Sequence, residues 1–485
     1  MYISEVTDRL PEDERGPLET KVYETLKKLN IPFVRVDNDA VEAMEECGGI
    51  GEKLGAQICK TIVLCNRKKT LFFLVVLGVP LLVMEFAMGR ASYRSLARSY
   101  EALEPQGSKW HRFKWLGLVG CYLLMMFYTV VCGWTIAYFV KAAMGTFDGT
   151  EDVTMVFGSM LGNPMELTGW MLLVAVIGFG VCAMGVQKGV ERITKVMMAA
   201  LFVIMALLCV HSLTLEGGQA GLEFYLLPNF DNLFNNPNAS FPQIVYAAMS
   251  QAMFMLSIGV GSMSIFGSYV TRDRKLTGEA VNVALLDALV AIMAGLIIFP
   301  ACFAYGINPD AGPGLVFLTL PTVFEQMPLG HLWCTLFFLF VAAAALSSVI
   351  AVFEAILRFT MDQWDISRKR AVAINAPILV LLSLPCVFGY NVWSDFLVPG
   401  IGDVQSLEDF ILSNNILPIG CLLFVLFCTT KRGWGWDKFM AEADRGEGIA
   451  FPKWTRLWVK YGVPALILIV FFTGWAPTMQ TWLGS

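Results

Sequence analysis

Long apolar runs separated by short polar breaks dominate the chain from Leu71 onward. Crossing the hydrocarbon core of a bilayer takes about 20 mostly apolar residues. The run 115–140 contains no Asp, Glu, Lys or Arg, so a soluble alternative for it has little support. We predict ten spans, at 71–89, 115–140, 167–186, 193–214, 243–270, 281–304, 332–357, 371–389, 410–428 and 457–475. The fold class expected is an all-α polytopic membrane protein.

Positive charge falls on alternate connections between these runs. The connections 142–166, 215–242, 305–331 and 390–409 contain no Lys or Arg, whereas the others contain several. Because Lys and Arg in short loops stay on the cytoplasmic side, we expect these four connections outside the cell, together with the C-terminal tail. The chain would lie in the inner membrane.

Ten spans also place the first 70 residues outside, although they carry 11 Lys and Arg. Three explanations stay open: either the basic segment is translocated, or the first run is not a true span, or a span is missing ahead of it.

The composition agrees with a membrane protein and narrows the chemistry. Of the 485 residues, 56 % are hydrophobic and only 15 % charged, too few charges to cover a soluble globule of this length. A net charge of -5 lacks the basic excess of nucleic-acid binding. The three histidines lie far apart and the 12 cysteines form no CxxC pair, which gives zinc, iron-sulfur and thiol-redox sites little support.

Residues 1–70 differ from the rest in pattern. Apolar positions at helical spacing in 16–30 and a strand-like stretch at 31–37 predict a small α+β unit. Three stretches carry a resemblance to a known family: LETKVYETLKKLNIPFVRVD, MEEC and IGEKLGAQICKTIVLCNRKKT. They are similar to the opening half of the YbaK-like deacylases that edit mischarged prolyl-tRNA. In that family a lysine at the position of Lys60 contributes to the substrate pocket. The rest of that pocket is absent, so Lys60 is better interpreted as a surface lysine.

One span carries a candidate helix break at Ser257-Ile258-Gly259-Val260-Gly261-Ser262. A continuous helix satisfies its own backbone, so main-chain groups can bind an ion in the membrane only where the helix is unwound and lines a cavity. The two glycines weaken the helix by about 1 kcal/mol each. The alternative is that they permit close helix packing, but the length of the run favours a break.

Acids at membrane depth are costly, about 2.5 to 3.5 kcal/mol on insertion scales, and mark function by default. Asp287 offers the oxygen ligand that a hard cation prefers, or is a hydrogen-bonded structural acid. We interpret Glu85 and Glu354 as groups that cap backbone or brace helices. Ser347 and Ser348 follow an alanine run, where serines ordinarily bond back to a carbonyl of the preceding turn.

From Leu77 onward the chain resembles the neurotransmitter:sodium symporter family, in its bacterial amino-acid branch. The resemblance rests on motifs that occur in the family's order, among them LGVPLLVMEFAMGR (77–90), SQAMFMLSIGVGSMSIFGSYV (250–270), AAALSSVIAVFE (343–354) and LEDFILSNNILPIG (407–420). It implies a LeuT-like fold over 71–485, preceded by the truncated YbaK-like segment. The family's first helix, which is broken at mid-membrane, has no counterpart in the resemblance.

The resemblance also implies a substrate site and a gate. Tyr128 would hold the substrate carboxylate, and Phe254 would form an aromatic lid over the substrate. The remaining pocket residues would be Leu124, Ser257, Val260, Ser348 and Val352, whose apolar character favours a hydrophobic amino acid. Asp409 matches the acid of an outer gate whose arginine partner belongs to the absent helix.

Sodium ions are the implied co-substrate. The implied ligands are Met255, through its backbone carbonyl, Asp287, Ala344, Ser347 and Ser348. We therefore expect sodium-coupled amino-acid symport by alternating access, with no enzymatic activity, impaired by the loss of the first helix. Two alternatives remain: an aminoacyl-tRNA deacylase fragment fused to a membrane domain, and a non-functional chimeric gene product.

Overall fold

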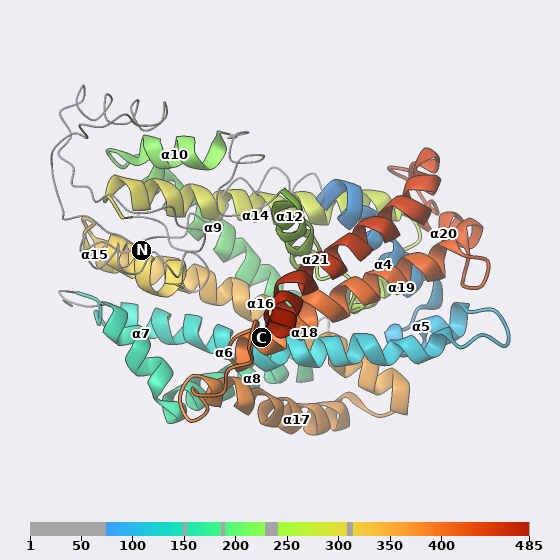
Figure 1. Ribbon diagram of the computed structural model, residues 1–485, viewed down its shortest axis with the longest axis horizontal. Helices are drawn as coiled ribbons and strands as arrows, with labels where there is room; N and C mark the ends of the chain where they lie inside the picture. The colour runs from blue at the N-terminus through green and yellow to red at the C-terminus, as the bar shows by residue number, and fades with distance from the viewer. Residues whose placement is uncertain (1–73, 149–152, 186–189, 228–240, 308–313, 485) are drawn as a thin grey trace. The chain divides into compact units, whose positions relative to one another are not determined.

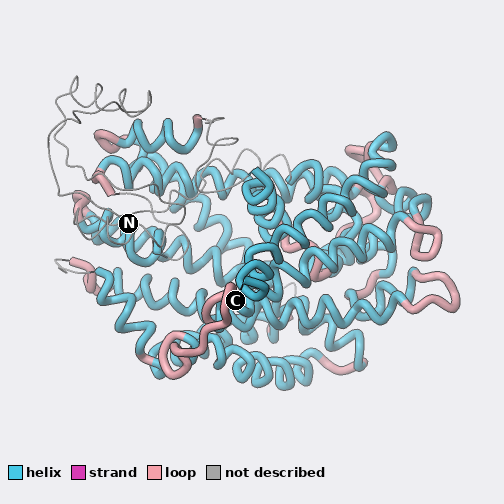
Figure 2. Tube along the Cα trace, in the orientation of Figure 1, coloured by secondary structure: helices cyan, strands magenta, loops and turns pink. Residues whose placement is uncertain are grey.

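The computed structural model describes residues 74–148, 153–185, 190–227, 241–307 and 314–484. The α+β unit expected at 1–70 lies outside the described residues. Within those five ranges the secondary structure is helical, and isolated bridges at Arg274–Glu447 and Val398–Gly402 are the nearest approach to strand pairing. Figure 2 shows these helices joined mainly by short loops.

Eight helical stretches of the described chain are long and apolar enough to cross a membrane. They contain α6 (Lys114–Ala143), α8 (Pro164–Ala183), α9 (Arg192–Leu213), α14 (Leu276–Ala304), α16 (Gly330–Trp364), α17 (Arg368–Gly389), α18 (Val404–Ile411) with η6 (Leu412–Ile416) and α19 (Leu417–Thr429), and η7 (Lys453–Thr455) with η8 (Trp458–Gly462) and α21 (Val463–Gly484). Each corresponds to a predicted span, which confirms a multi-pass membrane protein.

The first predicted span, 71–89, contains η2 (Leu74–Gly78) and most of α4 (Val79–Ser92) in its described part. The chain bends after this span, because α5 (Leu96–Leu103) follows α4 at an angle of 79°. The described part of the predicted span is helical from its first residue, Leu74.

The predicted span 243–270 is two helices rather than one. α12 (Phe241–Met255) and α13 (Ser262–Tyr269) are each too short to cross a bilayer alone. Shorter helices also occur in the connections: η3 (Trp110–Phe113), α7 (Val153–Gly162), α10 (Gly218–Leu226), η5 (Leu315–Thr319), α15 (Leu320–Glu325) and α20 (Trp436–Ala443).

Two clusters of buried apolar side chains hold the described helices together. The first cluster draws on α6, α8, α9, α16 and α17, and α16 packs against both α6 and α9 (Figure 1). The second cluster draws on α4, α12, α14, α19, α20 and α21. The break between α12 and α13 lies where the clusters meet, since Ile258 belongs to the second cluster and Val260 to the first.

Candidate functional site

The break between α12 and α13 is formed by residues with left-handed backbone. Ser257, Gly259 and Gly261 have φ of 52°, 99° and 74°. Glycine adopts such angles without the steric penalty that a Cβ brings, whereas serine there is strained. The predicted break is confirmed, and it leaves main-chain groups in the middle of a predicted span.

Glu85 braces this break. Its side chain is 1 % exposed, and its Oε1 accepts a hydrogen bond of 2.6 Å from the amide of Gly259. A carboxylate is a strong acceptor for a backbone amide that the unwound helix leaves without a helical partner. The interpretation of Glu85 as a bracing acid is confirmed, and its partner lies 174 residues away in the sequence.

The residues predicted for the substrate pocket lie at the first cluster or at the break. Leu124, Tyr128 and Phe254 pack against the first cluster, to which Val260 and Val352 also belong. Ser257 is at the break itself, and its carbonyl accepts from the Ser262 hydroxyl at 3.2 Å. Contact of these side chains with a substrate remains a prediction.

A cavity of about 390 Å³ joins three of the predicted residues. Tyr128, Ala344 and Ser348 line it. The other lining residues are Val131, Thr135, Val316, Phe317, Val341 and Ala345. Leu124, Phe254 and Val352 lie in the same cluster but do not line this cavity.

Three oxygen atoms meet within one turn of α16. The Ser347 hydroxyl donates to the Ala344 carbonyl at 2.8 Å, and the Ser348 hydroxyl approaches the same carbonyl at 3.4 Å. These contacts are the ordinary back-bonding of helical serines. Ser348 is exposed although its neighbour Val349 is fully buried, so this oxygen group borders open space. Its role as a sodium site remains a prediction.

Asp287 provides a second oxygen group, on α14. Its Oδ2 is buried, and no hydrogen-bond partner for it is found in the described part of the chain. Met255 packs against the second cluster, which includes Ala284 and Ala288 on either side of Asp287 in sequence. A buried carboxylate oxygen without a donor suits a cation, but contact with sodium is untested.

The two predicted gate residues have different surroundings. Phe254 packs against the first cluster, whereas Asp409 is exposed and accepts from the Ser413 hydroxyl at 2.8 Å. Across the described ranges, no ion pair to Asp409 is found. The neighbouring Glu408, which the sequence did not single out, is only 4 % exposed and has both carboxylate oxygens without a described partner.

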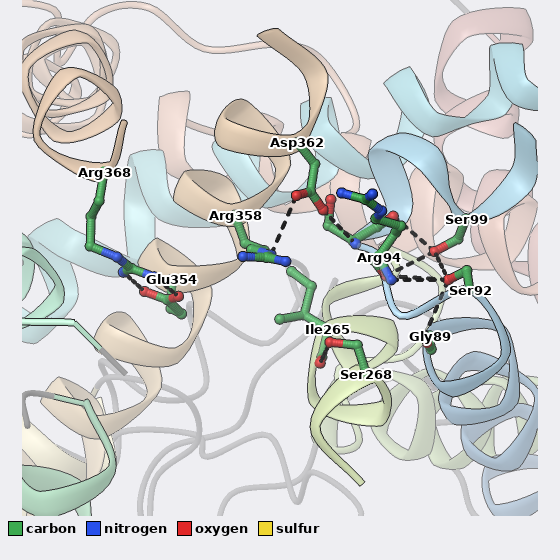
Figure 3. Close-up of polar contacts among 11 residues, drawn as sticks. Gly89, Ser92, Arg94, Ser99, Ile265, Ser268, Glu354, Arg358, Asp362 and Arg368 are labelled. Carbon is green, nitrogen blue, oxygen red and sulfur yellow. Dashed lines mark hydrogen bonds and ion pairs between the residues drawn. The ribbon is translucent and has the colours of Figure 1, made fainter. Parts of the chain in front are cut away.

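The sequence predicted only part of a charged group near the C-terminal end of α16. Figure 3 shows Glu354 paired with Arg368, whose Nη2 lies 2.8 Å from its Oε1. This confirms the interpretation of Glu354 as a bracing acid. Asp362 was missed: its Oδ2 accepts from the amide of Ser95 at 2.8 Å. The spacing of Arg358 and Asp362, four residues apart on one helix, was the available signal.

Comparisons with known proteins agree with this geometry. The model of the family described as "Sodium:neurotransmitter symporter family" matches residues 151–482. The chain is 35 % identical over 405 residues to the uncharacterized sodium-dependent transporter YhdH of Bacillus subtilis, covering 82 % of this chain and 87 % of that protein. It is 30 % identical over 421 residues to an uncharacterized sodium-dependent transporter of Haemophilus influenzae, covering 82 % and 88 %.

A solved structure is similar as well. The crystal structure of MhsT in complex with L-phenylalanine has a TM-score of 0.75 and 34 % sequence identity, covering 84 % of this chain and 91 % of MhsT.

Proposed function

Because the chain belongs to the sodium:neurotransmitter symporter family, we propose that it couples sodium entry to the uptake of an amino acid with an apolar side chain. Family membership makes it a sodium-dependent, multi-pass membrane transporter rather than an enzyme. The chemical class of the substrate is the proposal, and the structure of MhsT with L-phenylalanine supports it by similarity.

The observation that carries the proposal is the unwound segment at Ser257–Ser262 beside an apolar cluster. The amides of Ser257, Ile258 and Gly259 are already bonded within the protein. The Tyr128 hydroxyl is therefore the donor that would meet the substrate carboxylate beside this segment. The side chain of the amino acid would then rest among Leu124, Val260 and Val352. A charged side chain would be excluded there by its desolvation penalty.

Sodium would bind at the two oxygen groups. One is the Ala344 carbonyl with the Ser347 and Ser348 hydroxyls, and the other is the Asp287 carboxylate. Hard cations prefer such oxygen ligands. Binding of both solutes would favour closure on one side of the membrane and opening on the other, which is alternating access around a fixed site.

The test is uptake into proteoliposomes that contain the purified full chain. Labelled phenylalanine is added with sodium outside, and parallel vesicles receive potassium instead. We expect accumulation only with sodium, and competition by leucine but not by lysine or glutamate. Equal uptake in the two salts, or competition by charged amino acids alone, would contradict the proposal.

Sodium-stimulated binding of labelled phenylalanine in detergent is measured alongside uptake. The sequence predicts impaired transport. Comparing binding with uptake distinguishes an impaired transporter from a protein that does not have the proposed function. Binding with slow uptake would support the predicted impairment, whereas the loss of both sodium-stimulated binding and uptake would reject the proposed function. Incubation of the full chain with alanyl-tRNA tests the resemblance of residues 1–70 to a deacylase.

A further inference from the structure

Arg90, at the end of α4, is a fully buried cation. It is 0 % exposed, and a buried charge is tolerated only where it is paired and hydrogen-bonded. Its Nε donates to Glu442 Oε1 at 2.8 Å, its Nη1 to the Arg274 carbonyl at 2.5 Å, and its Nη2 to the Glu442 carbonyl. One guanidinium therefore joins the end of α4 to α20 and to the connection that follows α13.

The crossing of α4 and α13 is unusually close. A Cβ on Gly89 would lie 1.6 Å from the Ser264 carbonyl oxygen, and a Cβ on Gly267 would lie 2.4 Å from the Phe86 carbonyl oxygen. Glycine at both positions lets the two backbones touch. Arg90 follows Gly89 directly, so its hydrogen bonds close this crossing at its cytoplasmic end.

Glu85 closes the same crossing at the other end, through its hydrogen bond to Gly259 in the break. The half-helix α13 is thus fastened to α4 at both of its ends. Each fastening uses an ionisable side chain of α4 and main-chain groups next to α13. Hydrogen bonds are directional and are strengthened in a buried setting of low dielectric constant, so these bonds favour movement of α13 together with α4.

The opposite side of α13 borders a cavity of about 770 Å³. Phe266 and Tyr269 line it from α13, and Ala351 and Glu354 line it from α16. Figure 3 shows that Ser268 donates to its own helix at Ile265 and that Glu354 pairs with Arg368. Among the described residues, hydrogen bonds of Glu85 and Arg90 in α4 reach main-chain groups next to α13, whereas α13 meets α16 through packing contacts and this cavity.

We propose that Arg90 is a positioning residue that makes α4, α13 and α20 move as one unit when the cytoplasmic side opens and closes. This rests on the proposed transport function. The guanidinium transmits displacement of α4 to the main chain at Arg274, and hence to the half-helix beside the break. Glu442 carries the same displacement to α20.

Hydrogen-deuterium exchange of the purified full chain tests whether Arg90 holds α4, α13 and α20 together, and this measurement does not depend on transport. Arg90→Gln shortens the side chain and removes its charge, so we expect exchange to quicken at least 10-fold in 262–275 and 436–447, with α6 and α16 unchanged. Arg94→Gln is the matched control, because Arg94 lies near the end of the same helix and its side chain is exposed. It should exchange like the native protein. Unchanged exchange in Arg90→Gln, or a rise across all helices, would overturn the proposal.

A second variant, Glu442→Gln, keeps the proposal testable if Arg90→Gln fails to fold. It keeps an oxygen acceptor for Arg90 but removes the opposite charge, and we expect a smaller rise of about 3-fold, confined to the same two segments. No rise there, or a rise elsewhere as well, would contradict the positioning role.

Uptake and binding complete the test. Arg90→Gln should bind phenylalanine within 3-fold of the native affinity while its uptake rate falls at least 10-fold. Equal loss of binding and uptake would indicate a structural role only and would reject the positioning role. If the native chain takes up nothing, the proposed function fails, and the exchange data still decide the rigid unit.

Discussion

Tyr128 and Tyr122 lie on the same helix, α6, but their hydroxyls have different surroundings. Tyr128 lines the 390 Å³ cavity, whereas the Tyr122 hydroxyl donates to Asn375 on α17. Of the two, Tyr128 is the residue that we propose to contact the substrate. Replacing each tyrosine by phenylalanine removes one hydroxyl in both cases. Comparing the two variants therefore distinguishes a binding role from a packing role.

We predict that Tyr128→Phe weakens phenylalanine binding at least 10-fold. A hydrogen bond to a charged group contributes about 1.5 to 3 kcal/mol, and phenylalanine at this position keeps the ring but loses the donor. Binding of the labelled amino acid in sodium buffer measures the effect. Tyr122→Phe should bind normally, and equal affinities in all three proteins would contradict the assignment of Tyr128.

Substitution of Asp287 tests whether its carboxylate binds sodium. Asp287→Asn keeps the shape and removes the charge, so we expect the sodium concentration for half-maximal phenylalanine binding to rise about 10-fold, since a carboxylate attracts a cation far more strongly than an amide does. Asp395→Asn, an exposed acid in the connection 390–409, is the control. An unchanged sodium dependence in Asp287→Asn would remove this residue from the sodium site.

For single residues, the sequence predicted the role of a side chain better than it predicted the group that the side chain contacts. Glu85 and Glu354 were interpreted as bracing acids because acids in apolar helices need partners, and both are. Their partners lie in other segments, Gly259 in the break and Arg368 on α17. Which distant group meets a side chain depends on packing, which local pattern does not encode.

At the scale of single helices, the break is the feature with the clearest consequence. Gly259 has φ of 99°, and a Cβ there would lie 2.5 Å from the Leu417 carbonyl oxygen. We predict that Gly259→Ala lowers the free energy of unfolding by about 1 to 3 kcal/mol, from left-handed strain and this contact, and abolishes sodium-stimulated binding.

Thermal unfolding and phenylalanine binding measure this together. Gly278→Ala is the control, because Gly278 lies in α14 with no atom near its Cβ position. Alanine there should leave binding unchanged and stabilise the helix by about 0.5 to 1 kcal/mol. Normal binding by Gly259→Ala would show that the break tolerates a side chain.

The connection after α5 contains a pH-sensitive motif. Burial raises the pKa of Glu104, but hydrogen bonds from Ser108 and His111 outweigh it and leave the pKa below its usual 4.5. A lowered pKa means that ionised Glu104 stabilises the folded protein at neutral pH, and that this contribution is lost as the pH falls through the folded pKa.

We therefore expect Glu104→Gln to lower the free energy of unfolding by about 1 kcal/mol at pH 7. The difference from the native protein should shrink as the pH falls below 4.5 and vanish once the pH lies below the folded pKa of Glu104. Thermal unfolding across this pH range measures it, and a difference that persists in acid would exclude the charge as the cause.

For the whole molecule, the charge pattern predicts which ends of the helices face the cell interior. Met155 in α7 is 70 % exposed in a connection without Lys or Arg, and Lys438 in α20 is exposed in a charged one. A membrane-impermeant maleimide should label Met155→Cys in intact cells, and Lys438→Cys only after permeabilisation. The native protein is the blank, and the reverse pattern would invert the topology.

The ten apolar runs were recognisable from sequence because bilayer thickness sets a length that each helix must meet by itself. The break was recognisable because glycine acts locally on the backbone. The 79° bend between α4 and α5 was not predicted. Neither was the close crossing of α4 and α13, because both depend on the surfaces that neighbouring helices present.

The sequence alone determined the membrane class, the spans and the break, since hydrophobic length, charge and backbone preference act over a few residues; the residues that bind sodium and an amino acid stay a prediction. Tertiary structure alone decided that Tyr128 shares a cavity with Ser348, that Glu85 meets the amide of Gly259, and that Arg90 joins three segments. These contacts connect residues far apart in the chain, and their free energy arises only when the helices pack and exclude lipid and water.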